Sequence, residues 1–184
     1  MEFLQSGQGP FRTFLEERGV WDGSFTPPAT GPVHYLEGLD LLDHQTLCVH
    51  AVHLGDDEIQ LLAEKKAKVC LCPGSNRFLG VGRAQPEKML AAGIRPCLGT
   101  DSLASNPQLS LWREMAILAQ DHPALPAETI VAMATRYGAE ALGQSRQGHL
   151  QKGSCRPFLA VAYGGNDPFD FLVRDVAPKE LSWL

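Results

Sequence analysis

Three short apolar runs, separated by helical patterns, constrain the fold of this chain more than any other feature. The runs are Thr46–His50, Lys68–Cys72 and Ile94–Gly99, and the helical segments between them are Asp56–Lys66 and Pro86–Ala92. Strands that alternate with helices at this spacing form parallel sheets, because each helix returns the chain to the start of the next strand. We therefore predict an α/β fold with a parallel sheet.

The segments between and after these runs carry helix and loop signals. Glycine and proline predict a loop at Pro73–Gln85. Asn106, followed by Pro107, is typical of an N-cap with proline at the first helical position, and Pro126 opens a further helical pattern.

The C-terminal part differs in character. Glycines interrupt short strand-like runs there, such as Pro157–Ala162 and Asp170–Val173. We expect two parts, residues 1–147 with the parallel sheet and residues 148–184 as a β-rich tail that belongs to a small composite β-domain.

Composition excludes several classes of partner. The net charge is −5 and no basic cluster is present, so we expect no nucleic-acid partner. No apolar run approaches the roughly 20 residues that span a bilayer, so we expect no membrane partner. Five cysteines are an odd number, and four of them lie in apolar runs. This favours buried free thiols and a cytoplasmic location.

Polar residues follow all three predicted strands. His50 ends the first run, Asn76 follows the second, and Asp101 follows the third in Gly99-Thr100-Asp101. The carboxyl ends of parallel strands meet at one edge of a sheet, where active sites are built. An imidazole and a carboxylate at that edge can bind a metal or move protons around a bound water.

Each of these residues also has a purely structural interpretation. A histidine at a strand end is commonly a hydrogen-bonded structural residue, and Gly-Thr-Asp is commonly a turn or a helix cap. His53 is better explained as a structural loop residue. Only the occurrence of His50, Asn76 and Asp101 at matching strand ends favours a functional site.

The stretch from His50 to about Leu150 resembles the C-terminal half of the amidohydrolase superfamily. It is most similar to the deaminase and chlorohydrolase branch, which includes aminofutalosine and adenosine-derivative deaminases. The matching motifs are Val49–Leu54, Cys72–Asn76, Leu98–Asn106 and Ala132–Thr135.

The resemblance implies a fold and a chemistry. The fold would be the C-terminal portion of a (β/α)8 TIM barrel, about three to four βα units, followed by a short β-segment. The activity would be hydrolytic deamination of a small heterocyclic substrate, with Zn²⁺ or Fe²⁺ as the metal. Asp101 would be a catalytic residue and metal ligand, His50 would orient the water or polarise the substrate, and Asn76 and Ser102 would line the substrate pocket.

The sequence departs from the family in its metal ligands. The family uses a His-x-His on the first strand and a histidine on the fifth, and this chain contains no His-x-His. His34 and Glu37 have His-x-x-Glu spacing, but the apolar residues around them indicate a helix. We therefore expect no activity from this chain alone.

Three sources of the missing half are open. An N-terminal portion is absent from the sequence, or a separate partner supplies it, or the chain forms a homo-oligomer. The alternative function is a non-catalytic structural or interaction subunit. An unrelated doubly wound domain is also possible, but no Gly-x-Gly-x-x-Gly follows a strand to support nucleotide binding.

Overall fold

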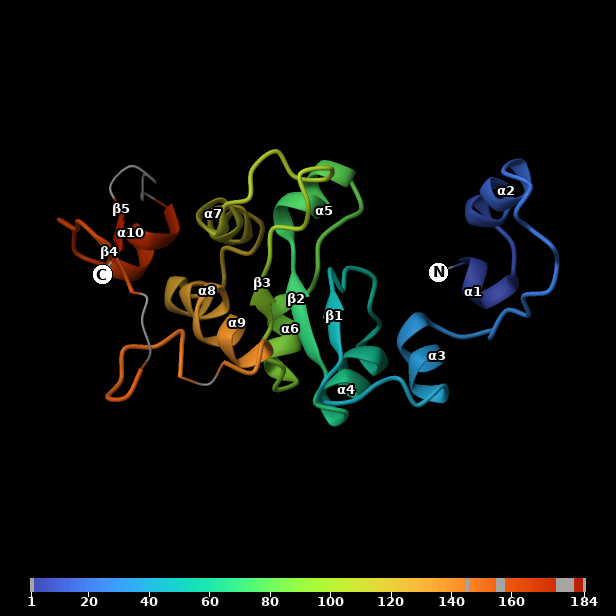
Figure 1. Cartoon of the computed structure of the whole chain (residues 1–184), viewed down its shortest axis with the longest axis horizontal. Coiled ribbons are helices and arrows are strands. Elements are labelled where there is room, and N and C mark those ends of the chain that lie inside the picture. Colours follow the sequence, from blue (N-terminus) through green and yellow to red (C-terminus); the bar gives the residue numbers. More distant parts are fainter. Residues whose placement is uncertain (1, 145, 155–157, 175–180, 184) are drawn as a thin grey trace.

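A three-stranded parallel sheet lies at the centre of the protein (Figure 1). The computed structural model describes residues 2–144, 146–154, 158–174 and 181–183. The strands are β1 (Leu47–Val49), β2 (Lys68–Leu71) and β3 (Cys97–Leu98), in the order β1-β2-β3. Leu47 is paired with Lys68, and Cys70 with Cys97. The predicted α/β fold with a parallel sheet is confirmed.

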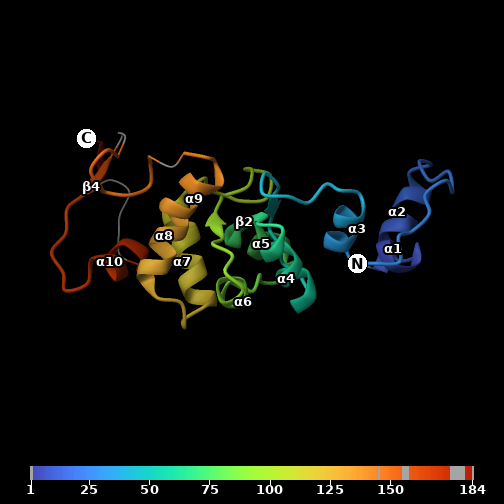
Figure 2. The ribbon, with the colours of Figure 1, turned by 90° about the horizontal axis from the view of Figure 1, so that it is seen from below.

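Helices surround this sheet and extend beyond it. In the described residues they are α1 (Glu2–Ser6), α2 (Pro10–Glu17), α3 (Pro32–Gly38), α4 (Asp56–Glu64), α5 (Pro73–Leu79), α6 (Pro86–Ala91), α7 (Leu111–Asp121), α8 (Ala127–Ala134), α9 (Arg136–Ala141) and α10 (Pro168–Arg174). Helices α8 and α9 contact β3, α7 packs between α5 and α8, and α4 contacts both α3 and α6. Figure 2 shows α7, α8 and α9 grouped beyond β2, on the side away from α3.

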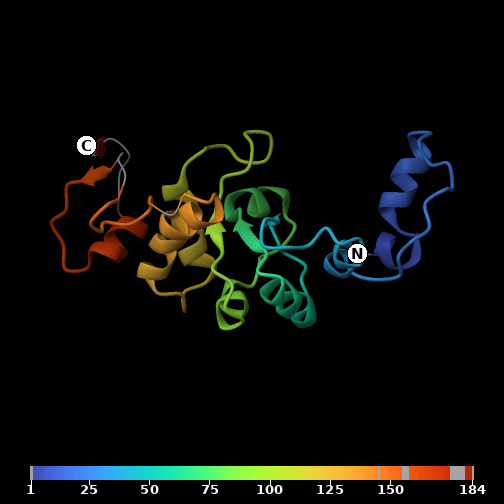
Figure 3. The ribbon, with the colours of Figure 1, turned by 60° about the horizontal axis from the view of Figure 1, so that its bottom comes forward.

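The N-terminal helices lie apart from the sheet. Figure 3 shows α1 and α2 at one end of an elongated molecule, beyond α3. The Phe3 ring of α1 contacts the rings of Phe11 in α2 and of Trp21 and Phe25 in the segment after α2. No helix among the described residues has the length and apolar character that a membrane span requires.

The main core lies between the sheet and its helices. Its fully buried members come from α4, β2, α6 and α8 and include Leu62, Val69, Leu71, Met89 and Met133. The cluster contains residues of the strands and of the helices that pack on them. The alternation of strands and helices along the chain therefore builds this core.

Leu62→Ala tests this core. Leu62 is 0% exposed, and we expect the substitution to lower the free energy of unfolding by roughly 3 kcal/mol, because it removes apolar contacts and leaves a cavity. Urea titration followed by circular dichroism measures the change. Leu142→Ala is the matched control, since Leu142 is 72% exposed, and we expect a change within about 0.5 kcal/mol. Equal effects of the two substitutions would contradict the core assignment.

The predicted loop at Pro73–Gln85 is wrong in its first half, which forms α5. Pro73 occupies the first turn of the helix, where its missing N–H costs nothing, and Gly80 ends the helix in the left-handed conformation with φ 65°. Glycine and proline therefore mark the two ends of a helix here, not a loop.

The predicted start of α7 at Asn106-Pro107 is also wrong. The N-cap is Ser110, whose Oγ accepts a hydrogen bond from the backbone N–H of Arg113. Asn106 is fully buried, and its side-chain amide donates to the backbone oxygen of Thr100 and to Glu114 instead. An Asn-Pro pair is a helix start only when the asparagine side chain is free to cap it.

The tail contains a helix where a strand was predicted. Residues 170–173 lie in α10, which Asp167 caps by accepting hydrogen bonds from the N–H groups of Phe169 and Asp170. Val173 is buried, and α10 packs against α7 and α8. The strand expected at 157–162 is present as β4 (Leu159–Val161), antiparallel to β5 (Leu181–Trp183), and Pro157 lies outside the described residues. The division at residue 147 stays a prediction.

Candidate functional site

His50, Asn76 and Asp101 come together at the carboxyl end of the parallel sheet. His50 directly follows β1, Asn76 lies in α5 after β2, and Asp101 follows β3 by three residues. The ring Nδ1 of His50 is 3.0 Å from Asn76 Oδ1, and its Nε2 is 3.6 Å from Asp101 Oδ2. Three segments far apart in the sequence thus place an imidazole, an amide and a carboxylate in one group.

The backbone at two of these residues has an unfavourable conformation. His50 and Asp101 have φ values of 67° and 58°, and Ala51 has a φ of 50°. A left-handed conformation at a residue other than glycine costs on the order of 1–3 kcal/mol, and such residues concentrate at functional sites. The left-handed residues thus lie just beyond the ends of β1 and β3, where the two side chains meet.

Asp101 is held by hydrogen bonds to both carboxylate oxygens. Its Oδ2 accepts from the hydroxyls of Ser75 and Ser105, each at 2.8 Å, and its Oδ1 accepts from the backbone N–H of Ser102 at 2.8 Å. The hydrogen bond from Ser75 is the largest cause that lowers the pKa of Asp101 below its ordinary value of 3.8, followed by those from Ser105 and Ser102. The carboxylate is therefore ionised at neutral pH.

Ser75→Ala tests this arrangement. We expect the pKa of Asp101 to rise toward 3.8, because the variant loses the hydrogen bond that contributes most to the shift. In the wild type, the lowered pKa stabilises the fold above about pH 3.8, and this contribution disappears as the pH falls through the folded-state pKa. Carboxyl ¹³C NMR titration measures the pKa of Asp101 in the wild type and in the variant. An unchanged Asp101 pKa in the variant would contradict the assignment.

The His50 ring presents a free electron pair toward Asp101 when it is neutral. Asn76 Oδ1 accepts hydrogen bonds only, so His50 Nδ1 carries the proton in this arrangement. Nε2 and Asp101 Oδ2 are then two acceptors 3.6 Å apart, both partly exposed. A pair of this kind can receive and hold a proton from a polar group or a water that lies between them.

Ser102, the fourth site residue predicted from sequence, contacts the group differently from His50 and Asn76. The hydroxyl of Ser102 accepts from the N–H of Ala104, so Ser102 contacts Asp101 only through its own backbone N–H. Sequence reasoning missed Ser75 and Ser105, which contact Asp101 directly. The available signal was their placement, since Ser75 precedes Asn76 and Ser105 lies four residues after Asp101.

Three thiols lie in or directly after β2 and β3. Cys70, Cys72 and Cys97 are free, as is Cys48 in β1, while Cys155 lies outside the described residues. The contact with Cys72 is the main cause that raises the pKa of Cys70 to about 11. Cys70 is therefore protonated at neutral pH, and the thiol form is a weak nucleophile.

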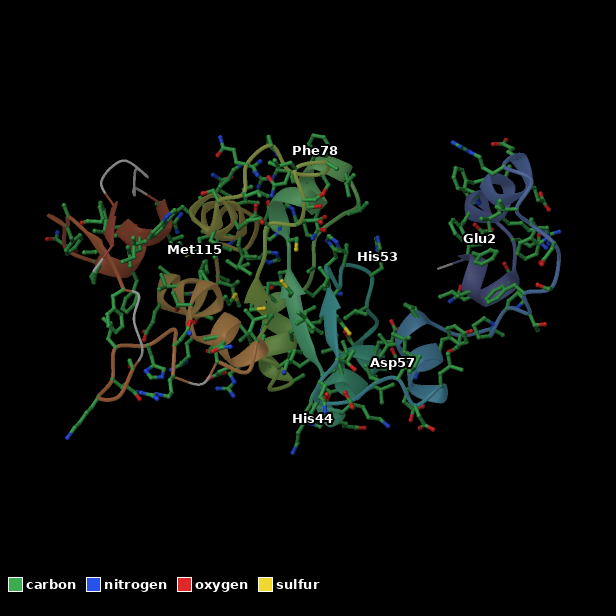
Figure 4. The ribbon with its side chains drawn as sticks, in the orientation of Figure 1. Glu2, His44, His53, Asp57, Phe78 and Met115 are labelled. Atoms are coloured by element: carbon green, nitrogen blue, oxygen red, sulfur yellow. The ribbon has the colours of Figure 1, made fainter. Side chains whose placement is uncertain are left out.

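Metal ligands are scarce in the part of the chain that the structure describes. No group of three His, Cys, Asp or Glu side chains lies close enough there to hold a metal ion. His34 belongs to α3 and is paired with Asp57 of α4, which Figure 4 labels beside α3, so it is not part of this site. The site geometry thus offers one carboxylate and one imidazole.

Curated relatives are deaminases. The chain is 38% identical to a 5-methylthioadenosine/S-adenosylhomocysteine deaminase of Bacillus cytotoxicus, and the match covers 71% of this chain and 32% of the relative. The corresponding enzyme of Bacillus cereus strain ATCC 14579 is 39% identical with the same coverage. The chain thus spans about a third of the length of these relatives.

Two solved structures that this chain resembles contain zinc. An adenosine deaminase from Xanthomonas campestris with bound zinc has a TM-score of 0.80 and 27% identity, over 84% of this chain and 38% of that one. An atrazine chlorohydrolase variant from Arthrobacter aurescens TC1, complexed with zinc and atraton, has a TM-score of 0.76 and 25% identity, over 84% and 38%.

A model of the amidohydrolase family matches residues 26–178, which include all three strands of the parallel sheet and every residue of the site. The relatives and the solved structures agree with this match. The chain therefore belongs to the amidohydrolase family.

Proposed function

We propose that this chain is the C-terminal part of a hydrolytic deaminase that acts on a heterocyclic amine. Its parallel sheet would be the last three strands of a (β/α)8 barrel, and its site would be one side of the active site. The observation that carries the proposal is the group of His50, Asn76 and Asp101 at the carboxyl ends of three parallel strands. The deaminase relatives support the type of reaction.

The chain's own residues have defined roles in this reaction. Water adds to the ring carbon that bears the amino group, and ammonia leaves after it receives a proton. Asp101, ionised and partly exposed, would accept the proton of the attacking water and pass it to the leaving amine. His50 would accept a hydrogen bond at Nε2 from the water or the substrate. Asn76 would fix the ring of His50 through Nδ1, and Ser102 would border the substrate.

The metal that the family implies does not fit the described residues by themselves. A protein holds zinc with four of its own ligands, or with three of its own ligands and a water. The site offers Asp101 and His50, and Asp101 Oδ2 already accepts two hydrogen bonds. We propose that Asp101 is one ligand of a Zn²⁺ or Fe²⁺ site whose other ligands come from outside this part of the chain.

The open edge of the sheet supports the same idea. Within the described residues β1 pairs with β2 only, and Leu47 and Val49 on β1 are 38% and 49% exposed. Phe78, on the outer side of α5 in Figure 4, is also exposed. An unpaired strand with exposed apolar side chains is a place where further strands pair. We propose that the other strands of the barrel pack here, in the same polypeptide or in a separate one.

A chimera tests the proposed function. The segment of the Bacillus cereus relative that this chain matches is replaced by this chain, and ammonia release from 5′-methylthioadenosine is measured with added zinc. We expect deamination by the chimera and none by the 184-residue chain alone. A chimera that folds, binds zinc and releases no ammonia from 5′-methylthioadenosine, S-adenosylhomocysteine or adenosine would overturn the proposal.

The exposed apolar face also favours a second candidate, a non-catalytic subunit that self-associates or binds a separate N-terminal half. Light scattering of the purified chain distinguishes the two. A monodisperse homo-oligomer, or a stable complex that releases no ammonia, would support the interaction subunit. A monomer that becomes active only within the completed barrel would support the deaminase.

A further inference from the structure

Glu114 is a carboxylate with no exposure to solvent, in the first turn of α7. Its Oε2 accepts a hydrogen bond from the backbone N–H of Gly74 at 2.6 Å, and its Oε1 accepts from Asn106 Nδ2 at 2.8 Å. Burial of a charge is costly unless hydrogen bonds compensate it, and bonds to a charged acceptor are the stronger ones. The roles proposed above leave Glu114 without a function.

Both partners of Glu114 lead to Asp101. Gly74 is followed in α5 by Ser75, whose hydroxyl donates to Asp101 Oδ2. Asn106 Nδ2 also donates to the backbone oxygen of Thr100 at 2.7 Å, and Thr100 directly precedes Asp101. Glu114 therefore connects the start of α5 with the loop after β3, on the two sides of Asp101.

The loop needs such support because of its backbone. Asp101 has a φ of 58°, a conformation that persists in residues other than glycine only when the surroundings enforce it. Arg113 adds to the support, since its NH1 donates to Asn106 Oδ1 at 2.6 Å and thereby orients the amide. The network is complete, with no unsatisfied buried side-chain atom among the described residues.

We infer that Glu114 is a positioning residue. By fixing Gly74 and Asn106, it holds the Asp101 carboxylate in the place where it transfers the proton. The inference rests on the proposed function, in which Asp101 transfers the proton. It assigns to Glu114 no contact with substrate and no proton transfer. Its action is geometric and passes through two hydrogen bonds.

Glu114→Gln tests the inference in the 184-residue chain. Glutamine has the same size, but its NH₂ group must face either the Gly74 N–H or the Asn106 NH₂, and both are donors. We expect the Ser102 amide, which donates to Asp101 Oδ1, to exchange with solvent at least about 10-fold faster relative to the amides of α8, and its proton resonance to shift. Hydrogen exchange followed by ¹H–¹⁵N NMR measures the exchange rate and the resonance position of the Ser102 amide.

Asp121→Asn is the matched control. Asp121 is a nearly buried carboxylate at the other end of α7 and joins the same two helices through Arg77. We expect it to alter global stability without a selective effect on the Ser102 amide. A change in Ser102 that only follows the α8 amides in Glu114→Gln would overturn the inference.

Two further measurements keep the inference falsifiable. In the active chimera, Glu114→Gln is expected to lower kcat by roughly 10- to 100-fold with KM nearly unchanged, while Asp121→Asn changes neither. A chimera that folds and binds zinc but releases no ammonia from the three substrates would refute the proposed function, whereas the Ser102 result would still decide the positioning. If Glu114→Gln does not fold, Arg113→Met replaces it, because the Arg113 side chain is partly exposed. We expect this variant to speed exchange of the Ser102 amide selectively, but by a smaller factor. No selective change at Ser102 would refute the inference.

Discussion

Asp101→Asn is expected to abolish deamination by the chimera, with a loss in kcat of about 10³-fold or more. Asparagine keeps the shape of the side chain but is neutral and cannot accept a proton at neutral pH. General acid–base catalysis contributes roughly 10²- to 10⁴-fold, and loss of a metal ligand adds to this. Ammonia release measures the activity, and elemental analysis measures bound zinc. A chimera within 10-fold of wild-type activity would exclude Asp101 as the proton acceptor.

The fold should tolerate this substitution. Ser75 and Ser105 donate to Asp101 Oδ2 and can donate equally to an amide oxygen. The new NH₂ group then faces the N–H of Ser102, but the Asp101 side chain is partly exposed, so water can satisfy both donors, whereas Glu114 has no exposure. Asp43→Asn is the matched control. Asp43 accepts hydrogen bonds from the backbone N–H groups of Gln45 and Thr46 just before β1, at the opposite end of the sheet from the site. We expect the control to retain activity, so that a loss confined to Asp101 reports chemistry and not general damage to a loop.

The central sheet could be predicted because its signals are local. Apolar runs, amphipathic helices and their spacing are properties of adjacent residues, and they determine the parallel order. Errors arose where one residue type has two uses. Pro73 and Gly80 mark the ends of α5, although glycine and proline in a short stretch favour a loop. Asn106 has the identity of an N-cap, but its amide is engaged by Glu114 and Thr100.

The site could be predicted only at its strand ends. His50, Asn76 and Asp101 follow regular strands, so the topology alone brings them together. Ser75 and Ser105 contact Asp101 through the turns that follow the strands, and Glu114 acts from a helix 40 residues after Gly74. Serine and glutamate are common surface residues, and no pattern in the sequence distinguishes buried ones. Their role depends on packing between α5 and α7, which the sequence does not encode locally.

Gly74→Ala is expected to destabilise the chain by about 3 kcal/mol, because the space for a side chain at this position is already filled. A Cβ atom on Gly74 would collide with Glu114 Oε1 and lie 2.7 Å from Arg113 NH1 and 2.8 Å from Asn106 Nδ2. These atoms cannot move apart without breaking the hydrogen bonds that satisfy a buried carboxylate. Overpacking costs roughly 1–3 kcal/mol, and a buried polar group left unsatisfied costs about 1–3 kcal/mol more. Urea-induced unfolding measures the loss.

Gly38→Ala separates this collision from the general effect of replacing a glycine in a helix. Gly38 ends α3, and nothing apart from its chain neighbours and the backbone of its own helix lies within 4 Å of the position of its Cβ. We expect this control to be neutral or to stabilise the chain by up to about 1 kcal/mol, because alanine restricts the unfolded chain and favours a helix. The decisive quantity is the difference between the two variants in the urea concentration at which they unfold. If Gly74→Ala unfolds at the same urea concentration as Gly38→Ala, Glu114 and Asn106 are free to move, and the buried network does not fix the loop that carries Asp101.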